Sequence, residues 1–305
     1  MKIIVTGGAG FIASHVSDAY IKAGHKVVII DNLLTGLRKN VNPKARFYKA
    51  DIRNLPLMEK VFKRERPEVV SHHAAIAEPV KSLRLPLPTL ETNVLGTTNV
   101  LLALGEHGRG KKKFIFASTG GAIYGEPKKI PADETTPRTP LSPYGLSKAL
   151  GEDVIKFYAR QYNFNYLIFR YPNVYGPRQN PKGEAGVVAI FGGLMKAGRR
   201  PTIFGDGSKA RDYTYVDDII RANKIVLRRG KNEIINLGWG KLITDRMIFD
   251  EVAKATGFEE KPIYAPYRKG EVYQIAIDAR RARRILGWKP KIKLAEGIQK
   301  TVAAL

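Results

Sequence analysis

The sequence predicts an α/β protein: a Rossmann-like, doubly wound parallel sheet with a smaller C-terminal α/β substrate lobe. Apolar runs alternate with helical stretches through the first 170 residues, and a glycine-rich turn follows the first run. From about residue 175 this pattern loosens, and Gly, Pro and aromatic residues become frequent. Alternation of strands and helices is typical of a parallel sheet that is covered on both faces.

Six short runs are expected to be buried strands, because they are continuously apolar rather than alternating. They lie at residues 2–6, 26–31, 46–50, 68–72, 113–118 and 165–170. Apolar spacing of three or four residues predicts helices near 11–23, 54–65, 88–107 and 144–162. A run at 233–237 is expected to return to the same sheet. We therefore expect one lobe at 1–174 plus about 212–238, and a second at about 175–211 plus 239–305.

Composition restricts the class of protein. The 305 residues include 44% hydrophobic and 26% charged side chains and no cysteine, which excludes disulfides, thiol nucleophiles and cysteine-ligated zinc. No metal site is expected. The apolar runs are much shorter than the roughly 20 residues that cross a bilayer. We expect a soluble, cytoplasmic protein, and the 18 Pro and 4 Met resemble the composition of heat-adapted proteins.

The formal charge of +24 needs its own interpretation. Basic residues are spread along the chain, with short runs at 109–113, 228–231 and 280–284. No aromatic-rich RNA signature or zinc-finger spacing accompanies them, so no specific nucleic acid is expected. A solvated basic surface that suits small anionic ligands is the favoured interpretation.

The glycine-rich turn predicts a dinucleotide site. Residues 6–13 read TGGAGFIA: Gly7 permits the tight turn, Gly10 lets the backbone approach a pyrophosphate, and Phe11 and Ile12 open a helix whose N–H groups face the phosphates. Asp31 ends the second strand, 21 residues after Gly10, where an acid binds the ribose hydroxyls. A carboxylate there repels a 2′-phosphate, so NAD is favoured over NADP.

Tyr144 and Lys148 stand four residues apart in a predicted helix. Ser142 and Pro143 are typical of an N-cap and a first helical residue, which places the phenol and the ammonium on one helix face. A neighbouring Lys⁺ stabilises a phenolate and lowers its pKa from about 10. This predicts Tyr144 as a general base for a sugar hydroxyl.

Tyr124 and Lys128 have the same spacing, but Pro127 disfavours a helix between them. Ser118 and Thr119 follow the fifth strand, at the carboxyl edge where doubly wound sheets bind ligands. Either hydroxyl could share the proton of the substrate with Tyr144, and Thr119 is preferred.

Together these motifs resemble the extended short-chain dehydrogenase/reductase superfamily and, within it, the UDP-glucose 4-epimerases (UDP-galactose 4-epimerases). The resemblance spans nearly the whole chain. It rests on residues 6–13, 31–33, 51–52, 73–75, 93–97, 118–125, 144–148, 170–178, 211–213 and 268–271.

The resemblance implies roles for further residues. Toward NAD, it implies that Asn32 belongs to the ribose motif, that Asp51 and Ile52 hold the adenine, and that Lys148 binds the nicotinamide ribose. The cofactor groove would also include Ala74, Ala75, Asn93 and Tyr171. Toward a UDP-sugar, it implies that Asn173 contacts the diphosphate, that Arg211 and Arg268 clamp its phosphates, and that Glu271 holds a uridine ribose hydroxyl.

The implied reaction leaves no net redox change. Tyr144 removes the proton of the sugar 4-hydroxyl while hydride passes from C4 to NAD⁺, the 4-keto sugar rotates, and hydride returns to its other face. Alternatives on the same scaffold are a UDP-glucuronate 4-epimerase and a nucleotide-sugar 4,6-dehydratase or decarboxylase. Gly120 and Gly121 stand where the dehydratases usually have Asp-Glu. A non-catalytic dinucleotide- or nucleic-acid-binding protein is a further alternative.

The resemblance also implies a homodimer that forms through the helices near 88–107 and 144–162. Apolar residues on these helices could serve an interface or the core equally well. They are Leu95, Leu101, Leu102, Val154 and Phe157.

Overall fold

The computed structural model describes residues 1–183 and 186–305. In this part of the chain seven strands form one sheet in the order β11-β6-β5-β4-β1-β2-β3, and every neighbouring pair is parallel. The strands are β1 (Lys2–Thr6), β2 (Lys26–Asp31), β3 (Arg46–Lys49), β4 (Val69–His72), β5 (Lys113–Thr119), β6 (Asn165–Tyr171) and β11 (Glu233–Asn236). The predicted doubly wound sheet is therefore confirmed. Its order reverses between β1 and β4, which is where such sheets bind ligands.

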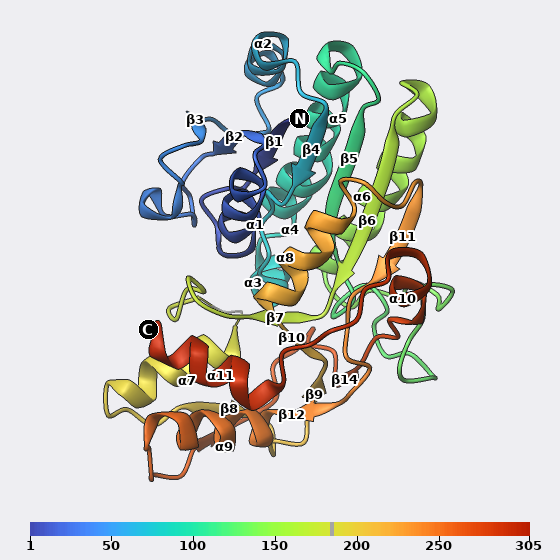
Figure 1. Ribbon diagram of the computed structural model, residues 1–305. Coiled ribbons are helices and arrows are strands. Elements are labelled where there is room, and N and C mark those ends of the chain that lie inside the picture. Colours follow the sequence, from blue (N-terminus) through green and yellow to red (C-terminus); the bar gives the residue numbers. More distant parts are fainter. Residues whose placement is uncertain (184–185) are drawn as a thin grey trace.

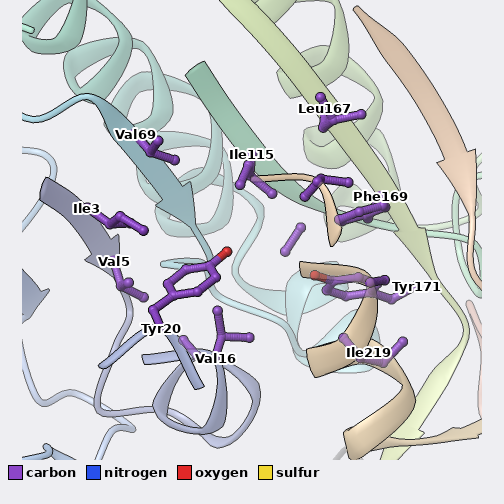
Figure 2. Packing of buried hydrophobic residues seen from close by; sticks show 14 of the residues in the cluster. Ile3, Val5, Val16, Tyr20, Val69, Ile115, Leu167, Phe169, Tyr171 and Ile219 are labelled. Atoms are coloured by element: carbon purple, nitrogen blue, oxygen red, sulfur yellow. The ribbon is translucent and has the colours of Figure 1, made fainter. Parts of the chain in front are cut away.

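Helices cover both faces of this sheet (Figure 1). One face carries α1 (Phe11–Lys22) and α8 (Val216–Ile225), and the other carries α2 (Leu55–Glu65), α5 (Gly96–His107) and α6 (Pro143–Gln161). Figure 2 shows Val16 and Tyr20 of α1 and Ile219 of α8 directed at the apolar strand residues. Burial on two faces explains why the strands are continuously apolar.

The helix predicted near 88–107 is divided in the structure. It comprises α4 (Pro86–Leu90), a π-helical turn η2 (Glu91–Leu95) and α5. Single π turns inside helices are frequent at functional sites, and this one contains the buried Asn93. The predicted start of the 144–162 helix is confirmed, because Ser142 accepts a hydrogen bond from the Gly145 N–H at 3.2 Å.

A second apolar core lies below the carboxyl ends of the sheet strands (Figure 1). Three helices form it: α7 (Val187–Lys196), α9 (Asp245–Thr256) and α11 (Leu294–Ala303). Short strands in this part of the chain pair in small sheets of their own: β7 (Asn173–Tyr175) with β10 (Tyr213–Tyr215), β8 (Thr202–Phe204) with β13 (Ile263–Ala265), and β9 (Ala210–Arg211) with β12 (Ile243–Thr244) and β14 (Gln274–Ile275).

The remaining elements are short. They are η1 (Arg38–Asn40), α3 (Pro79–Arg84) and α10 (Arg280–Leu286), which packs beside β11. We propose the two-lobe division that the sequence predicts, and we call residues 1–174 plus 212–238 the first lobe and residues 175–211 plus 239–305 the second lobe.

Candidate active site

One cavity of about 660 Å³ extends from the glycine turn after β1 to the second lobe. It places side by side residues that are far apart in the sequence. The predicted site residues that line it are Gly7, Gly10, Phe11, Ile12, Ala75, Ser118, Thr119, Tyr144, Lys148, Tyr171, Asn173, Arg211, Arg268 and Glu271. Asp31, Asn32, Asp51, Ile52, Ala74 and Asn93 lie outside this wall.

The glycine turn brings the backbone close to the opposite loop. Gly7 has φ +69°, and a Cβ there would stand 2.7 Å from the Ala74 backbone nitrogen. The first N–H groups of a helix have no acceptor within the helix. Gly10, the N-cap of α1, has no side chain that could accept from them instead. Free N–H groups at the positive end of a helix dipole fit a pyrophosphate.

Asp31 supports this turn from the end of β2. Its carboxylate accepts hydrogen bonds from the Ala9 N–H at 3.0 Å and the Leu33 N–H at 2.7 Å. A carboxylate has room for about four hydrogen bonds, so acceptor sites remain for ribose hydroxyls. The residues of the turn and Asp31 therefore fit a dinucleotide, which they would hold by backbone N–H groups and one carboxylate.

The predicted adenine residues form a separate group beyond Asp31. Arg53 forms a bidentate pair with the Asp51 carboxylate and, together with Asn32, lowers the Asp51 pKa to about 2. Ile52 is buried against Gly96 of α5. This group is held in place before any ligand arrives.

Asn93 holds the loop that follows β4 in place by hydrogen bonds. Its amide accepts from the Ile76 N–H at 2.8 Å and donates to the Ile76 carbonyl at 3.0 Å and the Ser147 hydroxyl at 2.9 Å. The structure thus places Asn93 as a link between this loop and α6, outside the cavity. Ala75 in the same loop does line it.

The two candidate hydroxyls have different partners. Thr119 lies beside the Tyr144 phenol and lowers its pKa. Ser118 instead donates to the Glu152 carboxylate at 2.7 Å, and Glu152 forms a buried ion pair with Arg170 at 2.7 Å. Because the Ser118 hydroxyl is committed to this pair, Thr119 is the hydroxyl placed to share a proton with Tyr144.

Burial dominates the titration of the Tyr–Lys pair. Burial raises the pKa of Tyr144 to about 12, although the Thr119 hydroxyl lowers it, and burial reduces the pKa of Lys148 to about 7. Lys148 donates to the Ala117 carbonyl at 2.8 Å and lies 4.8 Å above the Phe116 ring. The Tyr144 pKa is thus raised where the sequence predicts a lowered one, because burial disfavours the charged phenolate.

The alternative Tyr124–Lys128 pair is not helical. Tyr124 is buried, where it donates to Asn236 and accepts from Arg170, both at 2.8 Å.

Tyr171 lines the cavity beside His73, with 3.4 Å between the phenol oxygen and Nε2. Burial lowers the His73 pKa to about 4, so this imidazole is neutral near pH 7.

The second lobe contributes a cluster of charged side chains. Glu271 pairs with Arg268 and, at 2.6 Å, with Lys209, which also lies 3.3 Å from Asp245. Burial alone would raise the Glu271 pKa, but the Lys209 and Arg268 charges hold it below its ordinary value. Sequence reasoning missed Lys209 and Asp245. Both line the cavity, but neither belongs to a recognised motif.

The two arginines are positioned differently. Arg211 is buried and donates to the Ala210 and Tyr273 carbonyls at 3.0 and 2.8 Å, and burial lowers its pKa. Arg268 lies 4.2 Å above the Phe204 ring, and its buried Nε has no hydrogen-bond partner among the residues that the structure describes. Guanidinium groups with free donors fit the oxygens of a diphosphate. Among the described residues no group of acidic or His side chains is arranged to hold a metal ion.

Comparison with known proteins shows the family of the chain. A model of the NAD dependent epimerase/dehydratase family matches residues 3–238, and the chain belongs to this family. A putative UDP-glucose 4-epimerase of Methanocaldococcus jannaschii is 49% identical over 98% of this chain and 97% of its own.

Solved structures extend the comparison to bound ligands. The UDP-glucose 4-epimerase of Thermotoga maritima with UDP-glucose has a TM-score of 0.97 and 46% identity, covering 100% of this chain and 98% of its own. The Thermus thermophilus UDP-glucose 4-epimerase with NAD has a TM-score of 0.94 and 40% identity, covering 100% and 98%.

Proposed function

We propose that this protein is an NAD-dependent UDP-glucose 4-epimerase that interconverts UDP-galactose and UDP-glucose through a 4-keto intermediate. The observation that carries the proposal is one cavity in which Thr119, Tyr144 and Lys148 stand between a dinucleotide cradle and a cluster of cationic side chains. Relatives named UDP-glucose 4-epimerase, aligned over nearly the whole chain, support the same activity.

In this proposal the side chains of the protein transfer the proton, and the cofactor would accept and return the hydride. Bound NAD supplies a reversible hydride acceptor and, when oxidised, a positive charge beside the phenol. That charge would offset the burial that holds the Tyr144 pKa near 12. Tyr144 then takes the proton of the sugar 4-hydroxyl through its contact with Thr119 and returns it when the ketone is reduced.

The second lobe holds the nucleotide. Arg211 and Arg268 bind the diphosphate, Asn173 lies beside it, and Glu271 accepts from a ribose hydroxyl. The sugar is then anchored at one end only, which lets the 4-keto group turn over within the cavity. Lys148 additionally binds the nicotinamide ribose, and Tyr171 and Ala75 border that part of the groove.

The dehydratase alternative lacks the residues that it needs. Gly120 and Gly121 follow Thr119, and neither has a side chain that could move protons at C5 and C6. The space is also narrow, because a Cβ at Gly120 would lie 2.5 Å from the Ile277 side chain and one at Gly121 would lie 3.0 Å from the Asn173 amide oxygen. The UDP-glucuronate 4-epimerase alternative is distinguished from the main proposal by comparing the rates at which the protein converts different UDP-sugars.

The experiment supplies UDP-galactose, UDP-glucuronate and UDP-N-acetylhexosamines separately and resolves the configuration of each product. UDP-galactose carrying deuterium at C4 should give UDP-glucose that keeps the label, and mass spectrometry of released cofactor should find NAD. Loss of deuterium to solvent or stoichiometric accumulation of NADH would show a net oxidoreductase and reject the proposal.

We also propose a cytoplasmic, heat-adapted homodimer. The structure places Leu101 in the core, but leaves Leu95 and Phe157 59% and 54% exposed on adjoining helices, with Leu146 and Leu150 also exposed. Exposed apolar patches commonly mark interfaces. Within the described residues no helix is long and apolar enough to cross a membrane. Light scattering should give twice the 33.9 kDa chain mass, and the mass of a single chain contradicts the dimer.

A further inference from the structure

The three basic runs that are separate in the sequence come together where α10 of the second lobe packs against β11 of the first. The Lys113 ammonium donates to the Val226 carbonyl at 2.6 Å and lies 3.4 Å from the Gly230 carbonyl, which joins the run at 109–113 to the run at 228–231. The proposed catalytic cavity contains none of these residues.

The third run adjoins the second. α10 contains the run at 280–284 and packs beside β11 (Figure 1), where Arg281 pairs with Glu233. At the end of α10, a Cβ on Gly287 would lie 3.6 Å from the Arg229 guanidinium. We call seven exposed basic side chains of the three runs the basic face: Arg109, Lys111, Arg228, Arg229, Lys231, Arg283 and Arg284. Arg280 is also exposed, but it is left out because it pairs with Asp278.

Little negative charge compensates the basic face. Within residues 1–183 and 186–305, Arg109 is the one member with an ion pair, to Glu68 at 3.8 Å, and the other six have none. Two nearby carboxylates are already neutralised, Asp278 by Arg280 at 2.6 Å and Glu233 by Arg281. Uncompensated positive charge on one surface produces a local potential that attracts polyanions.

The surroundings of these charges indicate which polyanion fits. Among the described residues, none of the large exposed apolar or aromatic side chains belongs to the three runs. The apolar residues of α10 are turned inward, with Leu286 buried in the first-lobe core. A membrane-surface helix needs an exposed apolar face, and single-stranded nucleic acid is usually held by stacking on aromatic rings. A double helix needs neither, because its phosphates are all on the outside.

We propose that the basic face binds the phosphate backbone of double-stranded nucleic acid without reading its sequence. The guanidinium and ammonium groups replace condensed counterions along the duplex, so binding is strong at low salt and weakens steeply as salt rises. The site is separate from the catalytic cavity, so substrate and duplex bind independently.

The test measures the anisotropy of a fluorescein-labelled 20-base-pair duplex of random sequence between 50 and 200 mM KCl. One variant neutralises four members of the basic face: Arg229→Gln, Lys231→Gln, Arg283→Gln and Arg284→Gln. A control variant neutralises four exposed basic residues elsewhere: Lys39→Gln, Arg199→Gln, Lys254→Gln and Lys261→Gln. Each variant lowers the formal charge from +24 to 24 − 4 = +20. Thermal melting by circular dichroism establishes that both remain folded.

The basic-face variant should bind at least about 10-fold more weakly at 100 mM KCl, and its plot of log K against log salt should be shallower by about 3 to 4, near 0.9 for each lost phosphate contact. The control should change by less than about 2-fold. Three outcomes overturn the proposal: no saturable binding by the unmodified protein at 50 mM KCl, equal weakening of both variants, or binding to vesicles of anionic lipid but not to the duplex. A tighter complex with a single strand than with the duplex also overturns it.

Discussion

The two ends of the cavity face anionic groups by different physical means. At the glycine turn the first lobe offers backbone N–H groups and residues without charge, such as Gly7 and Gly10. At the other end the second lobe offers charged side chains that pair with one another, among them Lys209, Arg268 and Glu271. Backbone groups are immobilised by the fold, whereas ion-paired side chains can exchange partners. We infer that the first end suits a cofactor that stays bound and the second a substrate that turns over.

The largest expected effect lies where the two ends meet. Tyr144→Phe removes the proton acceptor but keeps the ring, so kcat should fall at least about 100-fold, while KM and the bound NAD change little. Steady-state kinetics and cofactor analysis measure the three quantities. Tyr158→Phe, on the same helix and outside the cavity, is the matched control. Full activity in the Tyr144 variant would remove Tyr144 from the mechanism.

A substitution of glycine should break the cofactor end. In Gly7→Ala the new methyl group meets backbone rather than a movable side chain, at 2.7 Å, and the residue keeps φ +69°. We expect loss of copurified NAD and a free energy of unfolding lower by about 1 to 3 kcal/mol. Gly24→Ala controls for strain alone, since Gly24 has φ +82° and, within the described part of the chain, only its own neighbours in sequence come within 4 Å of the added carbon. Similar NAD retention in both variants would contradict a close backbone approach at Gly7.

A change of charge should affect the substrate end alone. Lys209→Met removes the ammonium that holds Glu271 at 2.6 Å and leaves that carboxylate with Arg268. A hydrogen bond to a charged group contributes about 1.5 to 3 kcal/mol, so KM for UDP-galactose should rise by about 10-fold or more, with kcat and NAD retention nearly unchanged. Lys254→Met, on the exposed side of α9, is the control. A fall in kcat without a change in KM would show that the two ends are not separable.

The smallest expected effect concerns Asp212, which holds together segments that connect the two ends. Its carboxylate accepts from the Trp239, Gly240 and Ile277 N–H groups at 3.0, 2.8 and 3.2 Å, and burial raises its pKa to about 7. Because the folded state binds this proton more tightly than the unfolded state, the resulting stability is complete below about pH 4 and is lost as pH rises through 7.

Urea unfolding at about pH 5 and pH 8 therefore distinguishes Asp212→Asn from the unmodified protein. The unmodified protein should lose more free energy of unfolding over this range, because an amide does not titrate. Other titrating groups are common to both proteins, and they cancel in the difference. Parallel pH dependences would mean that Asp212 stays ionised in the folded protein.

Much of the first lobe could be predicted because its signals are local. A continuously apolar run predicts a buried strand, and Ser142 before Pro143 predicts a helix start, from neighbouring residues alone. The roles of Ser118 and Lys209 could not be predicted, because Glu152 and Glu271 reach them from 34 and 62 residues away. The phenol pKa differed for the same reason, since burial depends on walls that come from both lobes.

Sequence alone determined the alternation of strands and helices, the glycine turn with Asp31, and the residue types needed for proton transfer. These features arise from steric and hydrogen-bonding preferences over a few residues. Only the tertiary structure decided which hydroxyl faces Tyr144, which charges gather around Glu271, and that three separate basic runs share one surface. Those outcomes depend on Coulombic and hydrogen-bond contacts that act over a few ångströms. Residues that are far apart in the sequence come within this range only when the chain folds.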